Sequence, residues 1–384
     1  MQERLQIQYQ IKCRRALMKT IREIYDEIFS NKENFYYPHA EFLMMDTWTE
    51  ENAFEFIQKY FAMGSKEIFC EGINYQRYKR SIHTVSLYAL GIFLHKHISK
   101  EIDGNNNQDK VCEQHQFLYI WYMTCLYHDM GYAYEKNQRK LSTKCEDLEG
   151  FIEFIVGKKP CLFYGRDNSL ESLCRNYYKY IYETRGHIDH GIAGGIVLYH
   201  RLIKNYEDKK IKLGVPDQDE FIDEKTGTLF STDFFQDYEQ AATLIARHNM
   251  WRVSEDDIQK IEEYKKAGLQ ELILNEDQKK ISYDGEKQKK MLFLLCFADT
   301  IEPLKVYSKC DPQFVLEHLK MDVTKNHGDI TVNFYVDASV LKVSVLEERI
   351  KSLESFLNVE CEETIRRDDE VKIGIKFIKN AKKQ

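Results

Sequence analysis

The sequence predicts a mainly α-helical protein that ends in a small α+β appendage. Proline is nearly absent, with 5 residues in 384, whereas tyrosine and phenylalanine number 25 and 22. This composition is typical of compact helical proteins and not of chains with disordered tails. Apolar residues recur at helical spacing up to about residue 305 and alternate strictly in two later segments. We therefore expect a helical domain over 1–305 and a small α+β domain over 306–384.

The charge and the cysteines indicate a cytoplasmic protein. The net charge of −7 provides no general attraction to nucleic acid or to an anionic membrane. The ten cysteines include no C-x-x-C pair, and several stand within apolar helical runs, as in a protein that keeps its thiols reduced. The N-terminal sequence MQERLQIQYQIKCRR is too polar for a signal peptide, and the longest apolar stretch, 117–127, is too short to span a bilayer.

Three helices are predicted in the first quarter of the chain. Loosely spaced apolar residues predict a packing helix over 2–29, and a threonine cap followed by acidic residues predicts another over 46–63. The third helix, over 75–98, carries His83 among aliphatic residues. His95 and His97, at its far end, are expected to be solvated and to complement the helix dipole.

A strongly apolar helix over 112–130 is predicted to be central to the fold because it is hydrophobic nearly all round. It follows a polar loop over 101–110, and His128 and Asp129 close it before Gly131. Alone, a His-Asp dipeptide at a helix end is usually structural. Its meaning depends on whether other metal-ligand residues converge on it.

The next segment, 131–186, is expected to be irregular to helical. It forms either an inserted lid or substrate-facing wall, or a surface helix with buried tyrosines. A helix over 187–206 follows, and the glycines and alanine near its start allow close approach of a neighbouring helix. Such packing would place His190 near the core.

Two later helices carry further candidate ligands. The helix over 232–251 has His248 near its end, and the helix over 289–303 has Asp299 after an apolar run. A hairpin is expected around 224–227, before the first of them.

The C-terminal part has a different pattern. Alternating apolar residues predict strands over 329–337 and 371–377, and a helical stripe predicts a helix over 345–358 between them. This order suits a β-α-β-β sheet with one helix packed on it. The appendage is also a candidate contact surface for a protein partner or for a second copy of the chain.

Six histidine and aspartate side chains stand out, five of them on or at the ends of apolar helices. They are His83, His128, Asp129, His190, His248 and Asp299. Polar groups on core-facing helix surfaces cost free energy unless a partner satisfies them, and a bound metal would satisfy all six together. Imidazole and carboxylate ligands suit divalent Mn, Fe, Co, Ni or Zn, with Mg less comfortable.

The six ligands can be divided between two ions. The first ion would be held by His83, His128, Asp129 and Asp299, and the second by His190 and His248. Asp129 would bridge them, because a carboxylate has two oxygens. Two metals roughly 3.5 to 4 Å apart can generate hydroxide from water and clamp the oxygens of a phosphoryl group. The sequence thus predicts one or two divalent ions, with His128 and Asp129 at the catalytic centre.

The order H…HD…H…H…D resembles the HD-domain superfamily of metal-dependent phosphohydrolases. KRSIHTVSLYALGIFL, LYHDMGY and FADTIEP resemble that family's first-histidine helix, its His-Asp motif and the helix of its last aspartate. DHGIAGG and LIARHNM resemble the third- and fourth-histidine helices of the branch that can hold two metals. The resemblance covers about 75–303. It implies an HD-type helical bundle, metals held between helices, and hydrolysis of a phosphate ester.

Two features depart from the branch that hydrolyses cyclic-di-GMP. That branch carries two adjacent histidines followed by a GYP-type signature, whereas this chain has His248 followed by Asn249 and no such signature. A lysine often follows the His-Asp motif in that branch, and Tyr132 stands near that place here. That substrate is therefore disfavoured.

Phosphate needs positive partners besides the metals, and guanidinium groups can hold it bidentately. The basic residues nearest the ligands in sequence, together with the tyrosine after the His-Asp motif, are the candidate substrate-binding residues. They are Lys79, Arg80, Tyr132, Arg185 and Arg247. Asp189, beside His190, is expected to cap its helix.

Three functions follow from these residues. The first is a metal-dependent phosphohydrolase acting on a small phosphorylated substrate, expected to be a nucleotide or signalling nucleotide. The second is a binding module that keeps the metal site and senses a nucleotide. The third is a metal-dependent nuclease, which the net negative charge does not favour. The plainest alternative, a helical protein with structural histidines, must treat the ordered motifs as coincidence.

Overall fold

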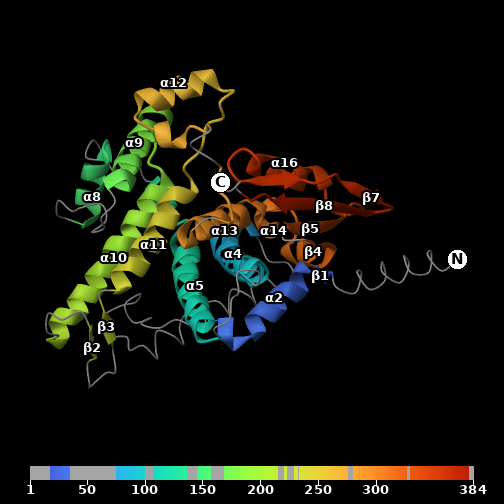
Figure 1. Cartoon of the computed structure of the whole chain (residues 1–384), viewed down its shortest axis with the longest axis horizontal. Helices are drawn as coiled ribbons and strands as arrows, with labels where there is room; N and C mark the ends of the chain where they lie inside the picture. Colours follow the sequence, from blue (N-terminus) through green and yellow to red (C-terminus); the bar gives the residue numbers. More distant parts are fainter. Residues whose placement is uncertain are drawn as a thin grey trace, which may run out of the picture. The chain divides into compact units, whose positions relative to one another are not determined.

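The computed structural model describes residues 18–34, 75–99, 107–135, 145–156, 168–214, 220–222, 229–231, 233–275, 280–284, 286–326 and 329–379. Over these residues the protein is mainly α-helical with a small antiparallel sheet, as predicted (Figure 1). The chain forms two compact units. Unit 1 combines the N-terminal helix, the helix of His83 and the described residues from 281 onward, and unit 2 holds those from 107 to 280. The predicted boundary after residue 305 stays a prediction.

The helices of unit 1 are centred on α4 (Tyr75–Ser99), which matches the predicted helix. It packs against α2 (Ile21–Ser30) and α13 (Lys287–Ile301). Two short helices follow, α14 (Pro303–Val306) and α15 (Pro312–His318), each with proline in its first turn and an acidic cap before it. These starts place Glu302, the cap of α14, directly after the helix that carries Asp299.

The sheet of unit 1 has the order β1-β4-β5-β8-β6, with β7 also paired to β8, and every pairing is antiparallel. Its strands are β1 (Lys19–Thr20), β4 (Leu319–Asn326), β5 (Asp329–Asp337), β6 (Val359–Cys361), β7 (Ile365–Arg367) and β8 (Glu370–Phe377). The alternating apolar residues of β5 and β8 are buried, which confirms the two predicted strands. Helix α16 (Val343–Leu353) lies between them in sequence and packs against α13 and β8.

The predicted β-α-β-β order has three strands, whereas this sheet has six, and the two strands that precede β5 in the chain, β1 and β4, were absent from the prediction. β4 alternates Leu319, Met321 and Val323 with polar residues, so its signal is present in the sequence. β1 pairs with β4 through Lys19 and Met321, which means that the N-terminal part of the chain completes the C-terminal sheet. Two residues of strand are too few to read from periodicity.

The helices of unit 2 are α5 (Asn107–Tyr127), α6 (Tyr132–Glu135), α8 (Leu148–Val156), α9 (Asn168–Arg185), α10 (His190–Leu213), α11 (Asp233–His248) and α12 (Ile258–Lys266). Figure 1 shows α10 and α11 side by side, and α5 packs against both. Strands β2 (Glu220–Ile222) and β3 (Leu229–Ser231) pair antiparallel, which confirms the predicted hairpin. None of the described helices combines the length and the apolar character needed to cross a bilayer.

Three predicted boundaries need correction or fall outside the described residues. Helix α5 begins at Asn107, so the end of the predicted loop over 101–110 is helical. It ends at Tyr127, so the His-Asp dipeptide lies in the turn after the helix rather than in its last turn. The predicted helix over 46–63 and most of that over 2–29 lie outside the described residues.

Candidate metal centre

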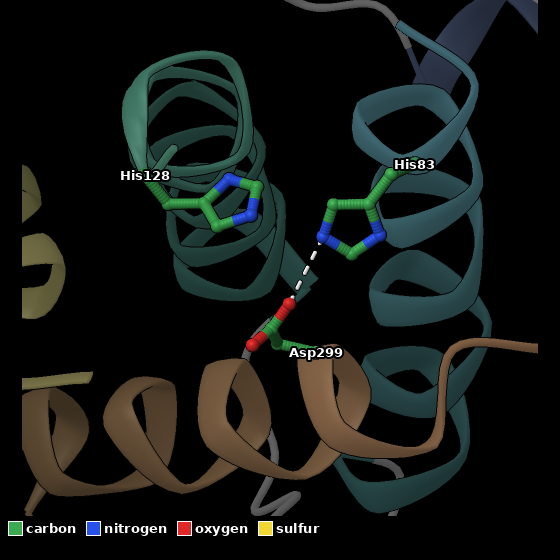
Figure 2. A group of neighbouring side chains, drawn as sticks. All are labelled: His83, His128 and Asp299. Atoms are coloured by element: carbon green, nitrogen blue, oxygen red, sulfur yellow. Dashed lines mark ion pairs between the residues drawn. The ribbon is translucent and has the colours of Figure 1, made fainter. Parts of the chain in front are cut away.

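The first group of candidate ligands belongs to unit 1 and joins α4 to α13. His83 is buried on α4, and its Nε2 lies 3.0 Å from Oδ1 of Asp299, whose side chain is 17% exposed (Figure 2). Lys305 reaches the same Oδ1 with its Nζ at 2.6 Å. The Asp299 carboxylate therefore already pairs with the positive charge of Lys305 when no metal is bound.

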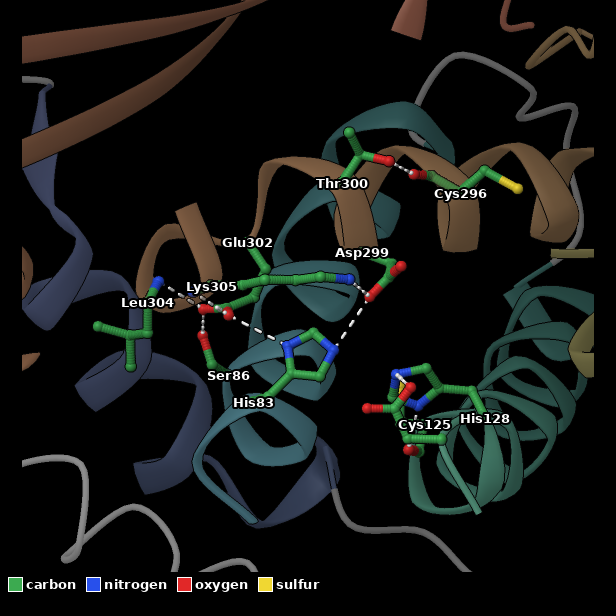
Figure 3. A network of polar contacts seen from close by, with 11 residues as sticks. His83, Ser86, Cys125, His128, Cys296, Asp299, Thr300, Glu302, Leu304 and Lys305 are labelled. Atoms are coloured by element: carbon green, nitrogen blue, oxygen red, sulfur yellow. Dashed lines mark hydrogen bonds and ion pairs between the residues drawn. The ribbon is translucent and has the colours of Figure 1, made fainter. Parts of the chain in front are cut away.

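Glu302 holds the other side of the His83 ring. This carboxylate is fully buried, and its Oε2 lies 3.1 Å from Nδ1 of His83. It also accepts hydrogen bonds from the Ser86 hydroxyl and from the backbone N–H groups of Leu304 at 2.8 Å and Lys305 at 2.7 Å (Figure 3). Glu302 was not among the residues predicted for the site. The sequence nevertheless places this acidic residue before a proline at a helix boundary, which is the pattern of a helix cap.

These two carboxylates set the protonation of His83. Burial lowers the pKa of His83, but the hydrogen bonds with Asp299 and Glu302 raise it by more than burial lowers it. The result is a pKa of about 9. A metal bound at Nε2 must displace the proton there, because an imidazole ligand binds through a lone pair.

The second group belongs to unit 2 and begins with His128, which is fully buried. Its Nδ1 donates to the backbone carbonyl oxygen of Cys125 at 2.8 Å (Figure 3). Its Nε2 lies 3.3 Å from Oδ1 of the neighbouring Asp129. The turn after α5 thus presents one imidazole nitrogen and one carboxylate together.

Two more histidines gather beside His128. The ring centroids of His128 and His248 are 5.7 Å apart, and those of His190 and His248 are 5.5 Å apart. Nδ1 of His248 donates to the carbonyl oxygen of Ile245. Tyr132 stacks on His190 with centroids 3.8 Å apart and planes at 14°, which holds that ring flat against the phenol. Unit 2 therefore brings together four of the six predicted ligands.

Small residues make this gathering possible, as predicted. A Cβ on Gly131 would lie 1.8 Å from the carbonyl oxygen of His190, and a Cβ on Gly195 would lie 2.5 Å from that of Ala242. Only glycine permits such close approach of two backbones. The turn after α5 therefore reaches α10 through its own Gly131, and α11 reaches α10 through Gly195 of α10.

Asp189 caps α10, which confirms its predicted role. Its Oδ1 accepts from the N–H of Ile192 at 2.9 Å, and its Oδ2 accepts from Nδ2 of Asn249 at 2.7 Å. Burial raises the pKa of Asp189, although these two hydrogen bonds act against the shift. The carboxylate thus connects the residue before His190 to the residue after His248.

The histidines fit a metal. In His128 and His248, Nδ1 faces a backbone carbonyl, and in His83 it faces a carboxylate. A carbonyl oxygen only accepts hydrogen bonds, and so does an ionised carboxylate. Nδ1 must therefore carry the hydrogen, which leaves Nε2 as the ligand atom. Metal-binding histidines are usually oriented in this way by the acceptor on their other nitrogen. Together with Asp129 and Asp299, the donor set suits a borderline divalent metal.

No protein-family model matches this chain, and no curated protein and no solved structure matches it. The likeness to the HD-domain superfamily therefore rests on the motifs quoted above.

The predicted substrate-binding residues have different surroundings. The side chains of Lys79 and Arg80, on α4, lie outside the described part of the structure. Arg185 is exposed at the end of α9, where its charge acts on tyrosine hydroxyls. Arg247 is half-buried next to His248 and has no hydrogen bond or ion pair with any described residue. Arg247 is thus the strongest of the basic candidates, and Tyr132 acts on His190.

Proposed function

We propose that this protein is a cytoplasmic, metal-dependent phosphohydrolase that cleaves a phosphate ester of a nucleotide or related small molecule. The observation that carries the proposal is the shared state of His83, His128 and His248. Each directs Nδ1–H at an acceptor, so Nε2 is the nitrogen that a metal would bind, after displacing the proton in the case of His83. His97 shares this orientation without any such neighbours. What a structural histidine does not need is the further gathering of His128, His190 and His248, with Asp129 beside His128.

The ligand assignment follows the chemistry of the two groups. The first ion would be held by His83, His128, Asp129 and Asp299. Of these residues, His83 and Asp299 lie together within unit 1, with Nε2 of His83 3.0 Å from Oδ1 of Asp299 (Figure 2). A second ion would be held by His190 and His248, with Asp129 as the bridge. A bound divalent metal supplies a Lewis acid that activates water and neutralises phosphoryl oxygens.

The chain's own residues would bind and orient the substrate. Arg247 offers a guanidinium that no described residue neutralises, so it is free to hold a phosphate bidentately. Tyr132 keeps the ring of His190 in a fixed plane by stacking on it. The catalytic centre would therefore lie at His128 and Asp129, where ligands of both ions meet.

One observation favours a second candidate, a nucleotide-sensing module without turnover. Lys305 already supplies Asp299 with a positive charge at 2.6 Å. Such a charge reduces what an ion at Asp299 would contribute, which favours a module that keeps the metal site and senses a nucleotide over one that turns it over. Nucleotide binding without hydrolysis across several metals would establish this alternative.

Metal analysis of the purified protein, followed by a hydrolysis screen, tests the proposal. Nucleotides, cyclic nucleotides and oligonucleotides would be offered with Mn²⁺ and with Mg²⁺. We expect bound divalent metal and turnover of a mononucleotide or cyclic nucleotide, and we expect the double change His128→Ala and Asp129→Ala to abolish both. His97→Ala is the matched control, because that histidine also donates Nδ1 to a backbone carbonyl but lies outside the ligand set. Protein without metal, or undiminished hydrolysis in the double variant, would refute the proposal. Turnover of oligonucleotides alone would indicate the nuclease.

A further inference from the structure

We propose that Glu302 is a positioning residue that fixes the ring of His83 for metal binding through Nε2. The inference deepens the proposed function and rests on it. It starts from the pairing of both ring nitrogens: Nδ1 lies 3.1 Å from Oε2 of Glu302, and Nε2 lies 3.0 Å from Oδ1 of Asp299. One short stretch of chain thus supplies a candidate ligand on one side of the ring and its orienting acceptor on the other (Figure 3).

The carboxylate of Glu302 is saturated. Oε1 accepts from the Ser86 hydroxyl and the N–H of Leu304, and Oε2 accepts from the N–H of Lys305 and faces Nδ1 of His83. A carboxylate has about four lone-pair sites, and the Ser86 hydroxyl and two backbone N–H groups occupy three of them. The fourth contact of this fully buried side chain is Nδ1 of His83, which donates its hydrogen to Oε2.

Capping α14 does not account for these contacts. The cap uses only the N–H groups of Leu304 and Lys305, as a short capping side chain such as Asp would do. The other two partners, His83 and Ser86, belong to α4 and lie one turn apart on it. Glu302 therefore carries a second role, directed at the histidine.

A buried hydrogen-bond chain keeps Glu302 in place. Ser86 has a single hydrogen, which it donates to Glu302, so the hydroxyl of Tyr25 must donate to Ser86 across 2.5 Å. Tyr25 is fully buried on α2. The chain Tyr25, Ser86, Glu302, His83 thus connects three elements of unit 1, and rotation of the carboxylate would break several hydrogen bonds at once.

The test compares two changes at Glu302 with one at Ser86. Glu302→Asp keeps the charge and an effective helix cap but withdraws the carboxylate from His83 by one methylene. Glu302→Gln keeps the length but places an amide NH₂ against N–H donors. We expect both to weaken Zn²⁺ binding by roughly 10- to 100-fold in calorimetry, the usual effect of removing the acceptor behind a histidine ligand. Ser86→Ala, the comparison variant, removes one donor from Oε1, but the N–H groups of Leu304 and Lys305 still hold the carboxylate and Oε2 still faces His83. It should therefore change the dissociation constant less than about threefold.

The second readout is the Nδ1–H proton of His83 in zinc-loaded, ¹⁵N-histidine-labelled protein. It should resonate far downfield in the wild-type protein, as expected for a hydrogen bond to a carboxylate. The resonance is assigned by its absence in His83→Ala. It should shift or disappear in Glu302→Asp. Should neither variant at 302 fold, the wild-type spectrum decides, because an absent downfield proton overturns the inference.

The outcomes separate the inference from the proposed function. Wild-type zinc affinity in both variants at 302, or an equal loss in Ser86→Ala, overturns the role of Glu302. A wild-type protein that binds zinc but hydrolyses none of the substrates leaves this role intact while the proposed activity fails. A wild-type protein that binds no metal overturns both.

Discussion

Asn249 donates a hydrogen bond from Nδ2 to Oδ2 of Asp189 at 2.7 Å, and this contact ties the end of α11 to the start of α10. His248 precedes one partner and His190 follows the other. The two imidazoles assigned to a second ion therefore owe their mutual position to a pair of side chains that were not themselves predicted as ligands.

Breaking this contact should cost both stability and the second ion. Asn249→Leu leaves Asp189 buried without its side-chain donor, which costs about 1 to 3 kcal/mol of unfolding free energy. Chemical denaturation measures this loss, and calorimetry should record one bound Mn²⁺ where the wild-type protein binds two. Asn176→Leu is the control, because its amide donates to the carbonyl of Gly268 at an exposed position. Unchanged metal stoichiometry in Asn249→Leu would contradict the prediction.

Gly131 should tolerate no side chain. A Cβ there would lie 1.8 Å from a backbone oxygen of His190, so Gly131→Ala must push α10 away from the turn that carries His128. We expect a loss of roughly 3 kcal/mol or more, at the upper end of overpacking costs, together with loss of metal. Gly194→Ala is the matched change, since its nearest contact is 3.2 Å away and needs only a small adjustment. Thermal unfolding compares the two, and equal midpoints would argue against this steric account.

The native Lys305 side chain should weaken metal binding, so its removal should strengthen it. Its ammonium lies 2.6 Å from Oδ1 of Asp299, where it competes with a cation for the same oxygen. Lys305→Met removes this charge, and the Mn²⁺ dissociation constant should fall roughly tenfold, about 1.4 kcal/mol, within the range for two charges a few ångströms apart. Lys309→Met, at an exposed position nearby in sequence, controls for net charge. Weaker Mn²⁺ binding in Lys305→Met would show instead that the lysine supports the site.

His95 should make the protein sensitive to acid. His95 is half-buried rather than fully solvated, and burial, followed by the charges of Lys287 and Lys290, lowers its pKa to about 3. The unfolded chain protonates it below its ordinary pKa of about 6.5. Between these values the unfolded state holds more protons, so stability falls as the pH drops, by at most about 1.4 kcal/mol per pH unit.

Removing this histidine should flatten the dependence. His95→Gln should lose less stability than the wild-type protein between pH 6.5 and pH 4, as measured by urea unfolding at each pH. His97→Gln, on the same helix, serves as the control. An unchanged slope in His95→Gln would mean that other groups dominate acid sensitivity.

Local patterns in the sequence determined much of this protein. Helical spacing located α4 and α13, alternation located β5 and β8, and an acidic residue beside His190 marked the cap of α10. These features are readable because periodicity and capping involve residues within a turn or two of each other. The candidate ligands were also visible, since polar residues in apolar helices require a reason.

Only the tertiary structure decided which distant residues contact each other. Glu302 contacts His83 across 219 residues of sequence, and β1 joins a strand some 300 residues later. Lys305 lies on Asp299, and Tyr132 stacks on His190. A sequence specifies which side chains are buried, but the partner of a buried group depends on how whole elements pack. For that reason the ligands could be named from the sequence, whereas the residues that orient them and compete for them could not.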